Sequence, residues 1–174
     1  MLKPIYLWGY MGAGKTRLGK RLAQKLNLEF YDLDRMIENH MQLVVGEIFN
    51  QFGEIYFRQL EQRFLEELSQ KNNVVISCGG GTPCYHQNKS LMKNSGLVVY
   101  LMVAHDELLS RLWRNRTQRP IIADMPSQQA LSDFIETHLS QRMPYYSQAH
   151  FAYDNTNPKS RLDELVNFIT EFRH

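Results

Sequence analysis

A glycine-rich octapeptide near the start of the chain, GYMGAGKT at 9–16, could hold a phosphate group. It fits the pattern G-x-x-x-x-G-K-[ST], in which backbone N–H groups wrap the phosphates, the lysine reaches the β and γ oxygens, and the hydroxyl holds Mg²⁺. The residues of this cradle are Gly9, Gly12, Ala13, Gly14, Lys15 and Thr16. An apolar run precedes the loop and an amphipathic run follows it, as the mechanism requires. The loop therefore predicts a nucleoside triphosphate with Mg²⁺ as the ligand, although motors, switches, regulators and small-molecule kinases all use it.

Two carboxylates, Asp32 and Asp34, stand at the end of the next short β-rich run. In doubly wound sheets the carboxyl ends of the strands line the ligand crevice, and side chains two apart on a strand share a face. One carboxylate could organise Mg²⁺ while the other accepts a proton from an attacking hydroxyl, which is the division of labour that phosphoryl transfer needs. The alternative is structural, because Asp34 precedes a predicted helical turn and aspartate is a favoured N-cap residue.

Farther along the chain, Arg58 and Glu61 are three residues apart on a predicted helix, where they could form an ordinary ion pair. Three glycines, Gly79 to Gly81, directly follow a buried strand, and their cost in chain entropy calls for a reason. A flexible linker is one reading. Linkers seldom start at the end of a hydrophobic strand, so we favour close approach of the backbone to a ligand.

Arginines cluster in the segment RLWRNRTQRP at 111–120. The stretch 119–127 has two prolines and little periodicity, which predicts a mobile loop that could bring an arginine to the transferred phosphoryl group. A solvated face or a nucleic-acid patch is the alternative, and the near-neutral charge of the chain argues against nucleic acid. A further cation, Arg142, could simply stabilise the C-terminus of a helix.

The elements that must position these residues alternate between strands and helices. Short apolar strands are predicted at 5–8, 30–32, 74–78, 97–103 and 151–153. Helices are predicted along the apolar stripes at 18–26 and 162–169, from about Glu54 to Leu68, around 107–113, and from about 128 to 139. Fully apolar strands suit a parallel sheet covered on both faces. The alternation predicts a doubly wound α/β fold.

Composition narrows the class of protein. The chain has 174 residues and is 43% apolar, which is enough for one sizeable core, so we predict a single domain over 1–174. The formal net charge of +2 gives no general attraction to nucleic acid or anionic membrane, and no apolar span of about 20 residues predicts a transmembrane helix. The spacing of Cys78 and Cys84 fits neither a zinc pair nor a disulfide framework, which favours a reducing cytoplasm. We expect a cytoplasmic monomer.

Taken in order, these motifs resemble those of the shikimate kinase family. They are GYMGAGKT, YDLD at 31–34, FRQLE at 57–61, SCGGG at 77–81, RPII at 119–122 and RMPYY at 142–146. The match covers nearly the whole chain, and the later motifs discriminate far better than the first. The resemblance implies a three-layer P-loop NTPase fold with a central parallel five-stranded sheet, a substrate-binding helical segment at about 33–61, and a mobile lid at about 114–127. Cys78 departs from the expected Thr, Ser or Leu, and Ile121 and Ile122 replace two leucines.

The resemblance assigns one group of residues to the acceptor, shikimate. Arg58 and Arg142 would bind its carboxylate, a planar anion that suits a guanidinium group, and Glu61 would orient Arg58. Asp34 would orient and deprotonate the reacting hydroxyl. The remaining acceptor contacts would come from Phe57, Gly79, Gly80 and Gly81.

A second group of residues would serve ATP and Mg²⁺. By resemblance, Asp32 and Ser77 lie with Thr16 on the metal side, while Lys15 and Arg119 neutralise charge on the γ-phosphoryl group. The adenine would lie between Pro158 and an arginine, in a loop that includes Asn157. We map that arginine to Arg111, with Arg114 as the alternative.

The resulting hypothesis is transfer of the γ-phosphoryl group of ATP to the 3-hydroxyl of shikimate, on the route to chorismate and the aromatic amino acids. Most of the catalysis would be positioning and electrostatics. A kinase of another small hydroxy acid, such as gluconate, is the nearest rival, but it has no evident need for Arg58 with Glu61 or for the triple glycine. A regulator that binds ATP without transferring phosphate would need neither Asp34 nor Arg119.

Overall fold

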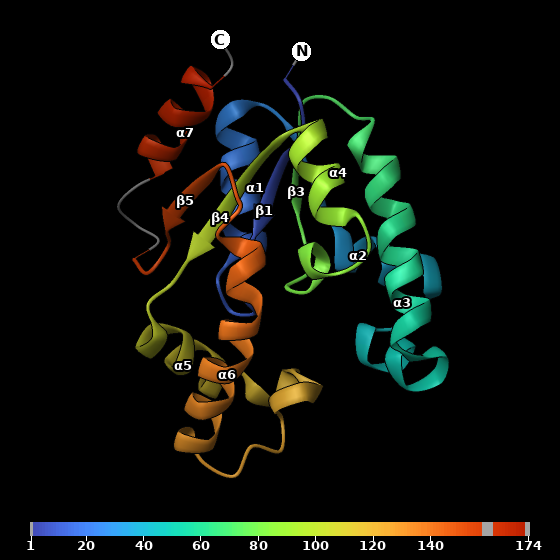
Figure 1. The fold of residues 1–174 in the computed structure, drawn as a ribbon, viewed down its shortest axis with the longest axis vertical. Helices are drawn as coiled ribbons and strands as arrows, with labels where there is room; N and C mark the ends of the chain where they lie inside the picture. Colours follow the sequence, from blue (N-terminus) through green and yellow to red (C-terminus); the bar gives the residue numbers. More distant parts are fainter. Residues whose placement is uncertain (1, 158–161, 173–174) are drawn as a thin grey trace.

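A five-stranded parallel sheet forms the centre of the molecule in the computed structural model, which describes residues 2–157 and 162–172 (Figure 1). The strands are β1 (Ile5–Trp8), β2 (Glu29–Asp32), β3 (Val74–Ser77), β4 (Leu97–Met102) and β5 (Phe151–Asp154). Their order is β2-β3-β1-β4-β5, and each neighbouring pair is parallel. The predicted α/β fold with a parallel five-stranded sheet is confirmed. Because all strands run the same way, the residues that follow them meet at one edge.

Helices cover both faces of the sheet. They are α1 (Lys15–Leu26), α2 (Leu33–Met41), α3 (Val45–Ser69), α4 (Asn88–Ser95), α5 (His105–Arg114), α6 (Gln128–Tyr146) and α7 (Leu162–Glu171). One face packs on α1 and α7 through buried side chains such as Leu22 and Leu165, and the other on α3 and α4 through Leu65 and Met92. Strands β1 and β3 are buried throughout, which explains why they read as uninterrupted apolar runs.

A third apolar cluster joins α5 to α6 at some distance from the sheet (Figure 1). Short 3₁₀ turns, Arg116–Gln118 and Pro120–Ile122, connect the two helices, and Ile122 is fully buried in the cluster. The region predicted as an irregular loop is therefore anchored by one buried side chain. Its predicted mobility stays a prediction.

Two local predictions were wrong and a third was incomplete. Helix α6 continues past the predicted end at 139 to Tyr146, with Pro144 inside it, so Arg142 lies within the helix and not at its C-terminus. Helix α3 is interrupted at Gly53, whose backbone has φ 81° and ψ 168°, so the segment predicted from about Glu54 is present, but the preceding turns from Val45 were not predicted. The helical turn weighed after Asp34 is present as α2, but its N-cap is Asp32 and not Asp34, and the Asp32 carboxylate accepts the Arg35 amide at 3.3 Å.

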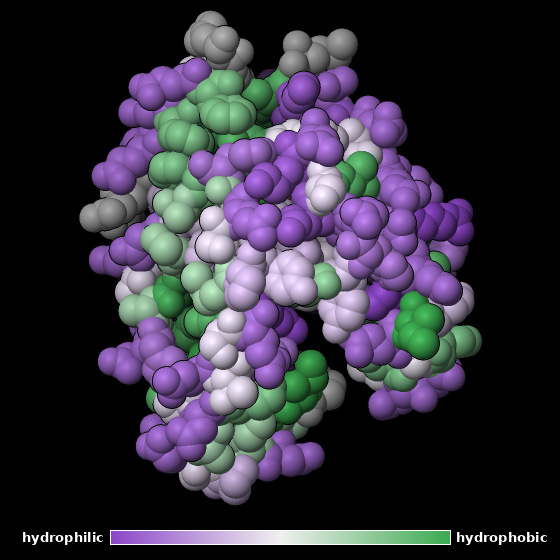
Figure 2. Space-filling model, viewed as in Figure 1, coloured by the Kyte–Doolittle hydropathy of each residue, from purple (hydrophilic) through white to green (hydrophobic). Residues whose placement is uncertain are grey.

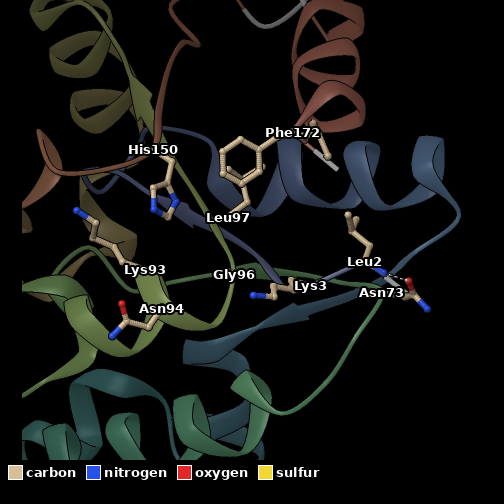
Figure 3. A pocket seen from close by; sticks show the side chains of 10 residues that line it. Leu2, Lys3, Asn73, Lys93, Asn94, Gly96, Leu97, His150 and Phe172 are labelled. Carbon is tan, nitrogen blue, oxygen red and sulfur yellow. Dashed lines mark hydrogen bonds between the residues drawn. The ribbon is translucent and has the colours of Figure 1, made fainter. Parts of the chain in front are cut away.

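Two cavities of similar volume lie at opposite ends of the sheet. One, of about 710 Å³, is at the carboxyl ends of the strands, where Figure 2 shows the surface divided by a cleft. The other, of about 730 Å³, is lined by residues such as Asn73, Gly96 and His150 that immediately precede strands (Figure 3). None of the described helices is both long enough and apolar enough to cross a membrane.

Candidate active site

The phosphate-binding loop joins β1 to α1 at the carboxyl edge of the sheet. Gly14 forms the N-cap of α1 with φ 88° and ψ 20°, a left-handed conformation that favours glycine. Lys15 donates from Nζ to the carbonyl oxygens of Gly9 at 2.7 Å and Tyr10 at 3.0 Å. Burial lowers the pKa of Lys15 to about 8, with the carboxylate of Asp34 opposing that shift. The loop thus points the free amides of a helix N-terminus and a buried ammonium group into the cleft, which suits phosphate.

Oxygen ligands for a hard cation lie beside this loop. Thr16 donates from its hydroxyl to the Asp32 carboxylate at 2.6 Å, and Asp32 pairs in register with the buried Ser77 on the neighbouring strand. The described residues contain no group of three His, Cys, Asp or Glu side chains that could enclose a metal ion. Mg²⁺ commonly binds through one or two protein oxygens, with waters and substrate phosphates completing its shell. The residues present fit that mode.

Asp34 lies within the first turn of α2, and burial raises the pKa of its carboxyl group to about 6, with the charges of Glu61 and Asp32 adding to the shift. It is close to the glycine turn, because a Cβ atom on Gly79 would lie 2.8 Å from Asp34 Oδ1. A carboxylate with a pKa shifted toward neutrality, in a cleft beside a lysine, has the properties of a general base.

A buried ion-pair network holds Arg58 on α3. Nη1 of Arg58 donates to Glu61 Oε2 at 2.9 Å, and the fully buried Glu61 accepts from the Thr82 hydroxyl at 2.6 Å. The Tyr85 ring stacks 3.9 Å from the guanidinium carbon. Arg58 is itself largely buried, so the surface ion pair weighed from sequence is excluded, while its role toward the acceptor stays a prediction.

The triple glycine is explained by the side chains pressed against it. A Cβ atom at Gly80 would lie 2.9 Å from Arg142 Nη1, and one at Gly81 would lie 2.7 Å from Arg58 Nη2. Tyr146 donates its hydroxyl to the carbonyl oxygen of Gly80 at 2.5 Å, which ties the turn to α6. With Asp34 and Glu61 against Gly79, two anions and two cations converge on three adjacent residues. The turn requires glycine so that these charged groups can approach the backbone.

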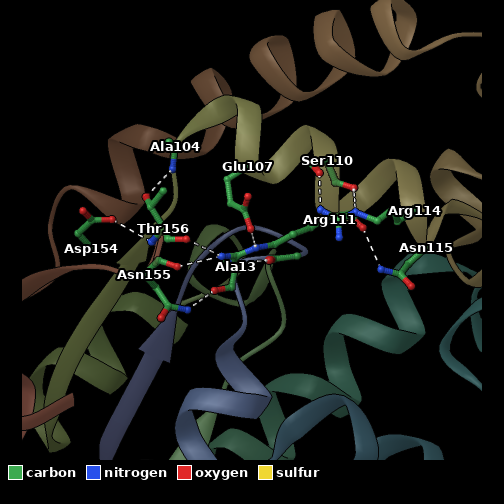
Figure 4. Close-up of polar contacts among 11 residues, drawn as sticks. Ala13, Ala104, Glu107, Ser110, Arg111, Arg114, Asn115, Asp154, Asn155 and Thr156 are labelled. Carbon is green, nitrogen blue, oxygen red and sulfur yellow. Dashed lines mark hydrogen bonds and ion pairs between the residues drawn. The ribbon is translucent and has the colours of Figure 1, made fainter. Parts of the chain in front are cut away.

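Arg111 links the phosphate-binding loop to the loop after β5 (Figure 4). Its guanidinium donates to the carbonyl oxygens of Asn155 at 3.1 Å, Thr156 at 2.9 Å and Gly12 at 3.3 Å, and to Glu107 at 2.6 Å. Arg114, the alternative adenine partner, instead contacts Ser110 on its own helix. These contacts favour Arg111. Asn157 is exposed, and Pro158 lies outside the described residues.

Arg119 lines the same cleft from the segment between α5 and α6. Burial lowers the pKa of the Arg119 guanidinium. Its positive charge in turn contributes to the lowered pKa of Lys15. No hydrogen bond or ion pair to another described residue holds this guanidinium. A half-buried cation facing a phosphate loop is suited to an anionic ligand.

Sequence reasoning missed several side chains of the site. Thr82 fixes Glu61, Tyr146 fixes the glycine turn, and Asn155 donates to the Ala13 carbonyl oxygen at 2.6 Å. Thr82 directly follows the SCGGG motif, and Tyr146 is the last residue of RMPYY. Their positions in or beside these motifs could have indicated that they belong to the site. Asn155 precedes the residues singled out in its loop.

Comparisons with known proteins agree with this geometry. A model of the shikimate kinase family matches residues 11–172. The shikimate kinase of Bacteroides thetaiotaomicron is 46% identical over 169 residues, which cover 96% of this chain and 96% of that protein. A crystal structure of shikimate kinase from the same organism matches 99% of this chain and 98% of its own, with a TM-score of 0.89 and 41% identity. The structure of shikimate kinase from Acinetobacter baumannii in complex with shikimate covers 98% of this chain and 94% of its own, with a TM-score of 0.83 and 32% identity.

Proposed function

The chain belongs to the shikimate kinase family, and we propose that it transfers the γ-phosphoryl group of ATP to the 3-hydroxyl of shikimate. The observation that carries this proposal is the convergence of Asp34, Arg58 and Arg142 on the triple glycine, beside the phosphate-binding loop. A half-buried base beside two cations is the arrangement expected for a small hydroxylated carboxylate. ATP would occupy the other end of the cleft.

On the acceptor side, Arg58 and Arg142 bind the carboxylate of shikimate and fix the ring. Asp34 accepts the proton of the 3-hydroxyl as that oxygen attacks the γ-phosphorus, and the bond from the γ-phosphorus to the bridging oxygen of ADP breaks. The raised pKa of Asp34 suits this role, because a base titrating near neutrality has driving force for the proton. Phe57 and the glycine turn complete the acceptor pocket.

On the donor side, the amides of Gly12 to Gly14 bind phosphate oxygens, and Lys15 and Arg119 neutralise the charge that develops on the transferred group. Thr16 would hold Mg²⁺, and Asp32 and Ser77 would contact the water molecules bound to it. When bound, Mg²⁺ would further neutralise the negative charge of the phosphates. Arg111 and the loop containing Asn157 and Pro158 form the adenine end. The segment 114–127 closes over the phosphates as a lid and carries Arg119 with it, while 33–61 is the substrate-binding segment.

We also propose that the protein works as a monomer in the cytoplasm. The thiols of Cys78 and Cys84 are both free, which is compatible with a reducing compartment. Size-exclusion chromatography with light scattering tests the monomer: the expected mass is that of one 20.5 kDa chain, and a stable dimer would contradict it.

The test of the reaction is ADP release from Mg-ATP with a panel of acceptors. We expect strong stimulation by shikimate and background rates with gluconate or nucleoside monophosphates. Stimulation by gluconate in place of shikimate would assign a different acceptor. Tight ATP binding without stimulation by any acceptor would indicate a nucleotide-dependent regulator.

A further inference from the structure

The guanidinium of Arg58 is bonded by two glutamates that differ sharply in their surroundings. Glu61 takes Nη1, while Oε1 of Glu54 accepts from both Nε at 3.2 Å and Nη2 at 3.1 Å. The Glu61 side chain is 0% exposed and is fixed by Thr82, whereas the Glu54 side chain is 49% exposed. The Nε and Nη2 atoms form the side edge of a guanidinium, which is a standard bidentate site for a carboxylate. Glu54 thus fills one carboxylate site on the arginine assigned to the acceptor.

Charge makes the position of Glu54 consequential. Glu61 neutralises Arg58, and the charge of Arg142 acts on the Glu54 carboxylate, so these two arginines and two glutamates carry no net charge before an acceptor binds. A second anion entering the same site is disfavoured by like-charge repulsion. An acceptor carboxylate can bind Arg58 at lower cost when Glu54 moves away.

Local structure allows Glu54 to move. Glu54 directly follows Gly53, where α3 is interrupted by a backbone conformation of φ 81° and ψ 168° that is nearly restricted to glycine. A Cβ atom on Gly53 would meet no atom within 4 Å, so there is open space beside this joint. Besides Arg58, Tyr85 acts on Glu54, and the hydrogen bond of its hydroxyl is the main influence that keeps the pKa of the Glu54 carboxylate below its ordinary value. Glu54 is therefore ionised and is held by few contacts.

We propose that Glu54 is an internal stand-in for the carboxylate of the acceptor: it occupies the side edge of Arg58 in the free protein and is displaced when the acceptor binds. This inference rests on the proposed function, because it assumes an anionic acceptor at Arg58. Glu54 is then a residue that sets acceptor affinity, and Glu61 is the residue that orients Arg58. Because Glu54 occupies the Nε and Nη2 edge of Arg58, it holds the arginine side chain in place in the free protein. The same contact lowers the affinity of Arg58 for weakly binding anions.

The test is Glu54→Gln, which keeps the size of the side chain and removes its charge. The expected result is a KM for shikimate lowered about two- to fivefold, the range set by a partly exposed ion pair, with kcat and the KM for ATP unchanged. Glu67→Gln is the matched control, because Glu67 forms an i,i+4 pair with Arg63 on the same helix and is similarly exposed, at 53%. The control leaves every constant unchanged.

A raised KM for shikimate in Glu54→Gln would overturn the proposal and make Glu54 a positioning residue for Arg58, and an unchanged KM would also overturn it. Tyr85→Phe is a second variant that keeps the ring over Arg58 and removes the hydroxyl that holds Glu54. It should lower the KM by a smaller factor in the same direction, and a raised KM would count against displacement. If the wild-type protein shows no response to shikimate at all, the proposed function fails. If it responds but Glu54→Gln does not bind shikimate more tightly, only the stand-in role fails.

Discussion

The two cavities at opposite ends of the sheet are nearly equal in volume and differ in chemistry. The cavity at the carboxyl ends contains the phosphate loop and buried groups of both signs, among them Lys15 and Asp34. The cavity at the amino ends has an apolar floor that includes Leu97 and Ile169, with Lys3, Lys93 and His150 near its rim. Its described lining includes no carboxylate. Among these described lining residues there is thus no acid–base pair, and the backbone of Gly96 is extended, with φ −165°.

Chain direction explains the difference. In a parallel sheet, the loops that follow the strands carry the helix N-termini, whose free amides attract anions. The loops that precede the strands carry helix C-termini and satisfied turns, such as the Val98 amide bonded to His150 Nδ1 at 3.0 Å. Burial lowers the pKa of His150, and the charge of Lys93 lowers it further, which favours the neutral form of the ring. The arrangement of charge, not the size of the cavity, identifies the reactive end.

The largest expected effect at the carboxyl-end cleft comes from Arg119→Ala. In the proposed mechanism, Arg119 neutralises the negative charge that develops on the transferred phosphoryl group. Such an interaction is worth a factor of about 10³ or more in rate. We expect kcat to fall by about that factor with a small change in the KM for shikimate, measured in a coupled ADP assay. A loss of less than tenfold would remove Arg119 from the transition state.

Arg58→Ala distinguishes the acceptor end of the cleft from the nucleotide end. Losing a charge-assisted hydrogen bond of about 1.5–3 kcal/mol raises the KM for shikimate about ten- to a hundredfold. The KM for ATP should change far less. Equal changes in both constants would assign Arg58 to the folding of the site, since Glu61 would then be left as a buried unpaired charge.

The pH profile tests the environment of Asp34. Its raised pKa means that the carboxyl group is protonated below about pH 6 and cannot accept the proton of the hydroxyl. The kcat/KM for shikimate should therefore fall about tenfold per pH unit below 6, because this constant reports the free enzyme. An ordinary aspartate would keep full activity down to about pH 4. A profile that is flat between pH 4 and 6 would contradict the assignment.

Changes at the amino-end cavity should have the smallest effect on activity. Leu97→Ala removes a buried side chain of β4 and should lower the free energy of unfolding by about 2–5 kcal/mol, measured by urea denaturation. Its kcat and KM values should stay within about twofold at a temperature where the variant remains folded. Lys93→Ala should change neither stability nor activity. A large loss of activity in Lys93→Ala would break the contrast between the two ends.

Much of the carboxyl-end site could be predicted because its residues follow from chain direction. Asp32 and Ser77 each end a strand, so a parallel sheet places both at the same edge; the resemblance to the family put Ser77 on the metal side, and β2 and β3 pair the two residues in register. The i,i+3 spacing of Arg58 and Glu61 likewise predicted their pairing. Such inferences need only local periodicity and one rule of topology.

The rest depends on contacts between distant segments. Helix α6 continues through Pro144 because Tyr146 is buried and bonded to Gly80, 66 residues away in the chain, and no local pattern encodes that contact. The predicted start near Glu54 coincides with the break at Gly53, but the helical turns from Val45 to Phe52 were not predicted. Glu54 gains its importance from Tyr85 and Arg58 together, so its spacing to Arg58 alone does not reveal its role.

The central claim is that shikimate is phosphorylated in the carboxyl-end cleft with Asp34 as the base. Phosphorus NMR of a mixture of protein, Mg-ATP and shikimate tests it most directly, run in parallel on Asp34→Asn and on Lys93→Ala. We expect a phosphomonoester on the 3-oxygen of shikimate, formed at equal rates by the wild type and Lys93→Ala. Asp34→Asn should form it about 10²- to 10⁴-fold more slowly than the wild type. Phosphorylated shikimate formed by Asp34→Asn at the wild-type rate, or none formed by the wild type, would contradict it.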